Sequence, residues 1–486
     1  MIAVLLILIP LIGGLALFAV KNEGSAKGIA LFTGIAVLVI SLLGLSVMNS
    51  PADLNCDILW MGALNSRFHV GLDGMGQLLC LLTAISFPLI FVATWNNTYK
   101  NAHRFYALML LSQAGLMGVF LAMDALLFYF FWELALIPVY FLSSIWGGEK
   151  RIAATFKFFI YTFVGSLIML VGLIYIYFQA NQSFDLQTWY DLKIPDRVQG
   201  WLFWMLFSAF AIKMPIWPFH TWQPDAYEQS PTAVTMVLSG IMVKMGVFAV
   251  IRWLAPVLPD GFFQWGDTVS MLCLIGMIYA SLIAIKQDDV KRLIAYSSIA
   301  HIGLMCLAIF ASNKSGLQGT MMQMFSHGVN IIGLWIVANT IETKYGTRKL
   351  SELGGLAQKD PALAILLVIV ALANIALPLT NGFVGEFMMF NGVFSSGVTK
   401  YGVLDTTVAG ICIILSAVYT LNMIKKIFYG NSNTLTQSGT PTSVPVLVSL
   451  SVIVVLIFIT GVYPKPMLQL TNDTVDAILK YMKTSI

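Results

Sequence analysis

Four ionisable side chains lie inside long apolar stretches of this sequence, where a charge is costly. Glu133, Lys213, Lys244 and Glu386 each have aliphatic and aromatic neighbours along the chain. On insertion scales each would cost about 2.5–3.5 kcal/mol at the centre of a bilayer, or roughly 10 kcal/mol together. That sum is comparable with the whole net stability of a domain, about 5–15 kcal/mol. These residues must therefore pair, lose their charge, or line a hydrated path.

Acids and bases gathered in apolar surroundings can exchange protons. Burial lowers the pKa of a lysine and raises that of a glutamate, whereas a nearby opposite charge reverses both shifts. A lysine whose acidic partner approaches or withdraws is therefore a switchable proton site. The alternative is a set of buried ion pairs that only fix helix packing. Replacing such pairs with apolar residues is often neutral or stabilising, which weakens that alternative.

Two histidines in other apolar stretches, His301 and His327, extend this chemistry. Imidazole titrates near neutral pH and can pass a proton between its two nitrogens. Serines beside both rings can hydrogen-bond them, although a histidine buried only for packing would look the same. No second metal ligand lies three or four residues from either histidine, so we expect no metal site.

Membrane-spanning helices must position these six residues. The chain has 486 residues, of which 58% are hydrophobic and 10% charged, against about 25% charged in soluble proteins. A span needs about 20 mainly apolar residues, and that length fits about fourteen segments of the chain. The apolar runs are continuous and do not alternate, which favours helices over a β-barrel. We therefore predict an all-α integral membrane protein with a single transmembrane domain, residues 1–486.

Two of the predicted spans, the seventh and the twelfth, contain residues that interrupt a helix. Pro215 and Pro218 lie in the seventh, and Pro378 and Gly382 lie in the twelfth. Proline removes a backbone donor and clashes with the preceding turn, so both helices should be broken. Two unrelated kinks would explain the prolines, but matched breaks in two halves are typical of inverted repeats around an ion path. We predict two five-helix repeats, helices 4–8 (residues 105–254) and helices 9–13 (residues 268–428), with flanking helices in residues 1–95 and 444–486.

Charge distribution and missing motifs narrow the function further. An even number of spans places both termini on one side, and more of the 27 lysines and arginines fall on the opposite side. The positive-inside rule then puts the termini outside the cytoplasm. The sequence has no phosphate-binding glycine loop, CxxC pair or haem-attachment motif. We therefore expect this chain to hold no NAD, flavin, ATP or iron–sulfur cluster.

Two stretches of the sequence resemble the antiporter-like membrane subunits of respiratory complex I, the NADH-quinone oxidoreductase. The first begins with Lys-Met-Pro at Lys213 and continues through Pro-Phe-His-Thr-Trp-Gln-Pro-Asp-Ala to Val234. The second runs from Asp289 through Tyr-Ser-Ser to His301. The resemblance covers about helices 4–13. Glutamate at Glu386 resembles the M-type branch of the bacterial family, since related branches commonly carry lysine there. Only a short tail is expected after the fourteenth helix.

The resemblance implies a proton route along the membrane midplane. Glu133 would pair with Lys213 in a half-channel that faces the cytoplasm. Lys244 would connect this pair to the second half of the chain. The two histidines would then relay protons to Glu386, the gate to the outside.

The resemblance also implies a location and partners. The chain would lie in the bacterial inner membrane, in contact with lipid and with other membrane subunits on both lateral faces, and it would bind no nucleic acid. An NADH-oxidising arm would carry FMN and iron–sulfur clusters, and quinone would be reduced in partner subunits. The same motifs are similar to those of multisubunit cation/proton antiporters, the main alternative. A self-sufficient solute transporter and a purely structural subunit are further alternatives.

Overall fold

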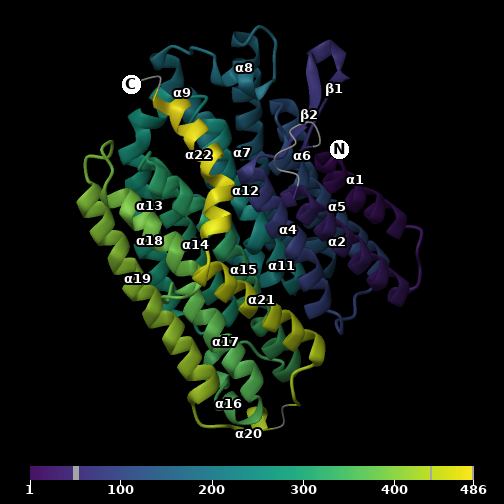
Figure 1. Ribbon diagram of the computed structural model, residues 1–486. Coiled ribbons are helices and arrows are strands. Elements are labelled where there is room, and N and C mark those ends of the chain that lie inside the picture. The colour runs from purple at the N-terminus through teal and green to yellow at the C-terminus, as the bar shows by residue number, and fades with distance from the viewer. Residues whose placement is uncertain (47–53, 438–439, 484–486) are drawn as a thin grey trace.

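The computed structural model describes residues 1–46, 54–437 and 440–483, and helices dominate it (Figure 1). Within these residues, 11 helices are long and apolar enough to cross a membrane. The predicted all-α multi-pass architecture is therefore confirmed. The three remaining predicted spans coincide with α1, which is short, and with two interrupted helices. The total of fourteen and the inverted repeats stay predictions.

The described chain up to residue 179 forms six α-helices, and two of them begin at an aspartate. Asp73 accepts a hydrogen bond from the backbone N–H of Gly76, and Asp124 accepts from Leu126 and Leu127. These contacts satisfy N–H groups that have no partner in the first helical turn, which fixes where each helix starts. The six helices are α1 (Ile2–Leu17), α2 (Glu23–Ser46), α4 (Gly74–Ala93), α5 (Ala102–Leu121), α6 (Ala125–Trp146) and α7 (Arg151–Gln179).

The middle of the chain alternates long helices with short or widened ones. Two five-residue π-helical turns, η2 and η3, interrupt the eighth predicted span. The elements are α8 (Leu186–Tyr190), α9 (Asp196–Lys213), α10 (Trp222–Gln229), α11 (Thr232–Val237), η2 (Leu238–Met242), α12 (Val243–Ala249), η3 (Val250–Leu254), α13 (Pro259–Lys286), α14 (Val290–Phe310) and α15 (Lys314–Tyr345).

The last part of the chain repeats this mixture of long and interrupted helices. A third π-helical turn, η5, ends the thirteenth predicted span. The elements are η4 (Leu350–Glu352), α16 (Leu356–Lys359), α17 (Pro361–Asn374), α18 (Asn381–Phe394), α19 (Gly402–Ile424), η5 (Lys425–Tyr429), α20 (Thr434–Gln437), α21 (Val444–Val462) and α22 (Lys465–Lys483).

The structure places a helix break at both of the predicted points. Helix α9 ends at Lys213 and α10 begins nine residues later, with Pro215 and Pro218 between them. Helix α17 ends at Asn374, and Pro378 lies in the loop before α18. A Cβ at Gly382, in the first turn of α18, would lie 2.3 Å from the Ala373 carbonyl oxygen. Glycine therefore allows α18 to start against the end of α17.

Two elements at one end of the bundle were not predicted. Strands β1 (Asn55–Met61) and β2 (Ser66–Gly71) form an antiparallel hairpin around the turn η1 (Gly62–Leu64). The expected short tail is helix α22, which packs on α4 and α15. Figure 1 shows the hairpin, α8 and both termini at one end, with α16 and α20 at the other. Helix α22 buries only one face, so it lacks the continuous apolar run by which spans are recognised.

Three helices form the centre of the bundle. The apolar windows of Thr232–Leu254, α14 and α15 are 100% buried, whereas those of α2 and α21 are 33% buried. The outer helices therefore present apolar side chains to the membrane or to other proteins. Lys244, His301 and His327 lie on the three central helices.

Candidate functional site

Lys244 occupies the centre of the bundle, on α12 between the turns η2 and η3. π-Helical turns are rare and frequently occur at functional sites. The side chain is fully buried, and its Nζ donates to the Ser239 carbonyl oxygen at 2.7 Å. The same Nζ lies 2.9 Å from Nδ1 of His327. An ammonium group has only donors, so Nδ1 is the acceptor whenever Lys244 is protonated.

His327 connects Lys244 to α14. Because Nδ1 accepts from the lysine, neutral His327 carries its hydrogen on Nε2, which lies 3.3 Å from Ser298 Oγ. The His301 ring lies 5.5 Å away, centroid to centroid. In the described part of the chain no hydrogen bond joins the two rings. A proton must therefore cross this gap through a hydroxyl or a bridging water.

His301 faces the acid of the second break. Its Nδ1 lies 3.2 Å from Glu386 Oε1, and the two side chains are only 7% and 4% exposed. Gln323 donates to the same carboxylate oxygen at 3.3 Å. The other oxygen, Oε2, is buried and has no protein partner among the described residues. Buried polar atoms are nearly always satisfied, so Oε2 is a natural place for a proton or a water.

The first half of the predicted route differs from this chain of contacts. Lys213, the last residue of α9, is 1% exposed, and its Nζ has no hydrogen-bond partner among the described residues. The Nζ lies 5.3 Å from the ring centroid of Trp132. The Oε1 atom of Glu133, the next residue on α6, is also buried and unpartnered.

The expected ion pair between Glu133 and Lys213 is therefore not formed in this structure. Among the described residues, no acid lies within 4.0 Å of the Lys213 Nζ. The lysine Nζ instead lies over the ring of Trp132, the residue before Glu133 on α6.

A glycine brings the two lysine helices together. A Cβ at Gly246 would lie 2.7 Å from the Phe210 carbonyl oxygen and 2.9 Å from the Met214 side chain. Helix α12 therefore packs closely on the end of α9. Lys213 and Lys244 are each two residues or fewer from this contact along their helices, although no direct contact joins them.

An ion-pair network ties α10 to α14 at the end of the bundle that carries α16 and α20. Arg292 lies 3.2 Å from Asp225 and 2.7 Å from Glu228, and Arg348 lies 2.5 Å from Glu228. These acids belong to the motif that follows Lys213 in the sequence. Their pairing holds the segment after the first break in place. A cavity of about 530 Å³ borders the network.

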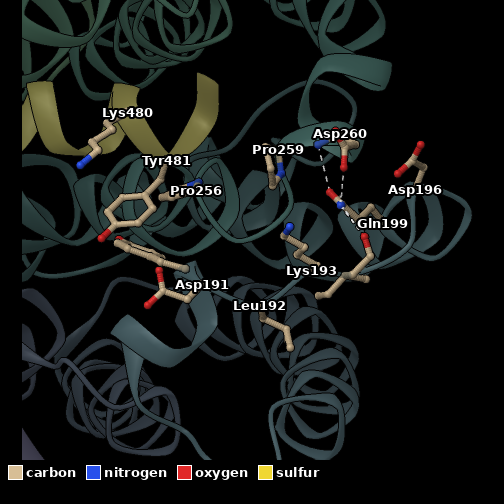
Figure 2. A pocket seen from close by; sticks show the side chains of 12 residues that line it. Asp191, Leu192, Lys193, Asp196, Gln199, Pro256, Pro259, Asp260, Lys480 and Tyr481 are labelled. Carbon is tan, nitrogen blue, oxygen red and sulfur yellow. Dashed lines mark hydrogen bonds between the residues drawn. The ribbon is translucent and has the colours of Figure 1, made fainter. Parts of the chain in front are cut away.

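The opposite end carries a polar pocket of about 650 Å³ (Figure 2). Figure 2 shows Lys193, Lys480 and Tyr481 around it, with Gln199 hydrogen-bonded to Asp260 at 2.6 Å. Helices α9, α13 and α22 contribute to its wall. None of the six predicted site residues lines this pocket or the cavity at the other end.

The buried Lys-His-His-Glu contacts beside a broken helix lie within residues 122–412, which match the family described as "NADH:quinone oxidoreductase/Mrp antiporter, TM". The chain belongs to this family. A family member from Rickettsia prowazekii, named NADH-quinone oxidoreductase subunit M, is 34% identical over 97% of both chains. A family member from Methanosarcina mazei, named F(420)H(2) dehydrogenase subunit M, is 33% identical over 98% of both chains.

A solved structure of the same family shows the same architecture. A chain of respiratory complex I from Thermus thermophilus superposes with a TM-score of 0.90 at 26% identity, over 99% of this chain and 100% of that chain. The predicted placement in the M-type branch is confirmed by relatives that bear that subunit's name. The role of each site residue stays a prediction.

Several contacting residues were missed in the sequence. Trp132, Gln323 and Asn374 touch the site from three different helices. Asn374 had one sequence signal, because a polar residue in an apolar run just before a proline break is unusual. Trp132 and Gln323 had none, since their contacts depend on how distant helices pack.

Proposed function

We propose that this chain is the proton-translocating membrane subunit of an NADH:quinone oxidoreductase, respiratory complex I. The observation that carries the proposal is the buried series of contacts from Lys244 through His327 and His301 to Glu386. All four groups can gain and lose protons, and three of them lie on fully buried helices. Burying them only for packing would be costly, because each charged form must leave water.

The contacts give each residue a step. Lys244 passes a proton from Nζ to Nδ1 of His327, and His327 releases the hydrogen on Nε2 toward Ser298 and His301. His301 passes its Nδ1 hydrogen to Glu386 Oε1, 3.2 Å away. Glu386 then releases the proton to the outside, and a proton from the Lys213 side refills Lys244. Redox chemistry in other subunits drives the cycle by changing the charge near Glu133.

We assign the redox chemistry to partner subunits. FMN and iron–sulfur clusters belong to an NADH-oxidising arm, quinone is reduced in a neighbouring subunit, and this chain holds no cofactor or metal. Other membrane subunits of the complex lie on its lateral faces. We place it in the bacterial inner membrane with both termini on the non-cytoplasmic side, because the more basic connections lie at the other end.

A cation/proton antiporter subunit is the second candidate. The description of the matched family includes Mrp antiporters as well as the oxidoreductase. That candidate has the same proton-exchanging residues but no redox partner, so co-purification separates the two.

The test uses cells that lack this chain and are complemented with the full-length protein. The tagged chain is purified in mild detergent, and NADH-driven proton uptake is measured in inverted membrane vesicles. We expect flavin, iron–sulfur proteins and NADH:quinone reductase activity to co-purify, and Lys244→Met to abolish proton uptake. Lys480→Met, an exposed lysine on α22, is the matched control and should pump normally. Purely membranous partners without NADH oxidation would replace this proposal with the antiporter reading.

A further inference from the structure

A second set of polar contacts reaches His301 from the side opposite Glu386. Asn374 Nδ2 lies 3.4 Å from His301 Nε2 and 3.4 Å from Ser297 Oγ. The Tyr419 hydroxyl donates to the same Ser297 Oγ at 3.0 Å. The four side chains come from α14, α17 and α19 and are between 1% and 6% exposed. The proposed proton route does not use Asn374, Ser297 or Tyr419.

The direction of these hydrogen bonds determines which nitrogen of His301 carries a proton. An amide nitrogen only donates, so His301 Nε2 must be the acceptor when it faces Asn374 Nδ2. Neutral imidazole has one donor and one acceptor, so the hydrogen then lies on Nδ1. Nδ1 is the atom that faces Glu386. The contact with Asn374 therefore selects the tautomer that can donate to the acid.

The helix break explains why Asn374 can make this contact. Helix α17 ends at Asn374, three residues before Leu377, and the backbone then turns through Ala376 at a φ of 57°. Positive φ is uncommon for a residue other than glycine and marks a sharp turn. The turn leaves the amide at the end of the helix and facing α14. The Ser297 hydroxyl of α14 accepts from this amide, and Tyr419 of α19 donates to the same hydroxyl.

We propose that Asn374, held by Ser297 and through it by Tyr419, is a positioning residue that keeps resting His301 in the Nδ1–H tautomer, the form that donates to Glu386. This inference rests on the proposed proton-pumping function. When the Nδ1 hydrogen moves to Glu386 Oε1, a proton arriving from the His327 side at Nε2 keeps the ring neutral. That Nε2–H form faces the Asn374 amide donor to donor, so the contact favours the form with an unprotonated Nε2 and the hydrogen on Nδ1 in the resting ring.

The first test compares two substitutions at Ser297 whose new side chains have nearly the same shape. Ser297→Thr keeps the hydroxyl and Ser297→Val replaces it with a methyl group, so any packing effect of the added carbon is common to both. Ser297→Val removes the acceptor of both the Asn374 amide and the Tyr419 hydroxyl. We expect it to slow NADH-driven proton uptake by at least about 2- to 10-fold, the effect of a single lost buried hydrogen bond, relative to Ser297→Thr. Tyr419→Phe should slow uptake similarly. Tyr106→Phe is the control, because its buried hydroxyl has no protein partner among the described residues.

The second test uses the pH profile, which a purely structural role would not move. Glu386 and His327 are the titratable groups that contact His301 from α18 and α15. Tyr419 of α19 bonds Ser297, which bonds Asn374, and Lys244 lies one contact beyond His327. Asn374→Asp has nearly the same shape but offers only acceptors, and its charge favours a protonated ring. We expect the pH profile of proton uptake to move upward by about one unit. Asn374→Leu should lower the rate without that shift.

Two outcomes separate the failure of this inference from the failure of the function. If the wild type pumps, Lys244→Met does not, and the Ser297, Tyr419 and Asn374 variants keep the wild-type rate and pH profile, the positioning role is overturned alone. If the wild type shows no NADH-driven proton uptake, the proposed function fails first. Should Asn374→Asp not assemble, the Ser297 pair still decides the question.

Discussion

The two regions of buried charge are built on similar helix breaks but differ in how their polar groups are satisfied. In the first region, Lys213 ends α9, and among the described residues its Nζ has no hydrogen-bond partner and lies over the Trp132 ring. In the second region, Asn374 ends α17 and its amide Nδ2 lies within hydrogen-bond distance of Ser297 and His301. Similar helix breaks thus place a lysine without a described hydrogen-bond partner in one half and a hydrogen-bonded neutral amide in the other.

On the basis of the proposed function, we infer different tasks for the two regions from this difference. A buried charge without a partner is unstable, so small changes around Lys213 alter whether it holds a proton. The second region has polar contacts from Lys244 to His327 and from His301 to Glu386, separated by a gap that a hydroxyl or a water must bridge. Under the proposed function, this arrangement is suited to conduct protons in a defined order. We infer that control lies in the first region and conduction in the second.

The largest expected effect is at the control region. Lys213→Ala should lower NADH-driven proton uptake by on the order of 100-fold, a typical loss when a proton-transfer group is removed. The protein should still insert and assemble, because Lys213 makes no ion pair that holds helices together among the described residues. Vesicle pumping, with co-purification as the control for assembly, checks this. Normal pumping by the variant would show that the role assigned to Lys213 is wrong.

The next effect is at the far end of the conduction region. Glu386→Gln keeps the shape of the side chain but removes its ability to release a proton, so uptake should fall at least about 10-fold. Glu386→Lys should retain part of the activity, because a lysine can also carry a proton beside His301. Pumping rates of both variants in the same vesicles are the measurement. Equal activity of Glu386→Gln and wild type would remove this residue from the route.

A smaller effect is expected where the control region contacts an aromatic ring. Trp132→Leu removes the ring under Lys213, a cation–π contact worth about 0.5–2 kcal/mol. The proton occupancy of Lys213 should fall, and pumping should slow about 2- to 30-fold by the same free-energy range. Trp335→Leu is a matched control on α15, because it removes a buried tryptophan for which no cation–π contact is found among the described residues. If both variants pump alike, Trp132 serves packing alone.

The smallest effect is expected at an ordinary ion pair outside both regions, which serves as a reference for the buried groups. His69 of the hairpin lies 3.2 Å from Asp185. The hydrogen bond with Asp185 raises the pKa of His69, and the hydrogen bond with His69 lowers the pKa of Asp185. The stability that His69 adds to the hairpin is fully present below the ordinary histidine pKa of about 6.5, and it is lost as pH rises through the raised pKa. The stability that Asp185 adds is present above the ordinary aspartate pKa of about 3.9, and it is lost as pH falls through the lowered pKa.

The hairpin should therefore be best protected against hydrogen exchange between about pH 4 and pH 6.5. At higher pH its free energy of opening should be lower by about 1 kcal/mol. Hydrogen exchange of residues 55–71 at pH 6 and pH 9, corrected for the intrinsic exchange rate, measures this difference. His69→Gln should remove the pH dependence. Unchanged protection in the wild type across this range would mean that the contact does not hold the hairpin.

The sequence by itself determined the class of the protein and the chemistry of its site. Continuous apolar runs can bury their backbone polar groups in lipid only as helices, so the spans could be predicted from composition. Prolines 215, 218 and 378 interrupt helices through local sterics, so both breaks could be placed as well. Glu133, Lys213, Lys244, His301, His327 and Glu386 were found because charge in an apolar run is costly wherever it lies.

Only the tertiary structure decided which of these residues touch. The contact between Lys244 and His327 spans 83 positions in the sequence, and the contact between Lys213 and the Trp132 ring joins two helices that are far apart in the chain. Helix α22 and the hairpin lack long apolar runs, so they could not be predicted from hydropathy. Only the structure shows that they form and pack on the bundle. The hydrogen bonds among Asn374, Ser297 and Tyr419 join three helices through neutral side chains. Neutral side chains are cheaper to bury than charges, so nothing in the sequence indicated that these three residues meet. Hydropathy reports the cost of burial, whereas the pairing of side chains depends on helix packing.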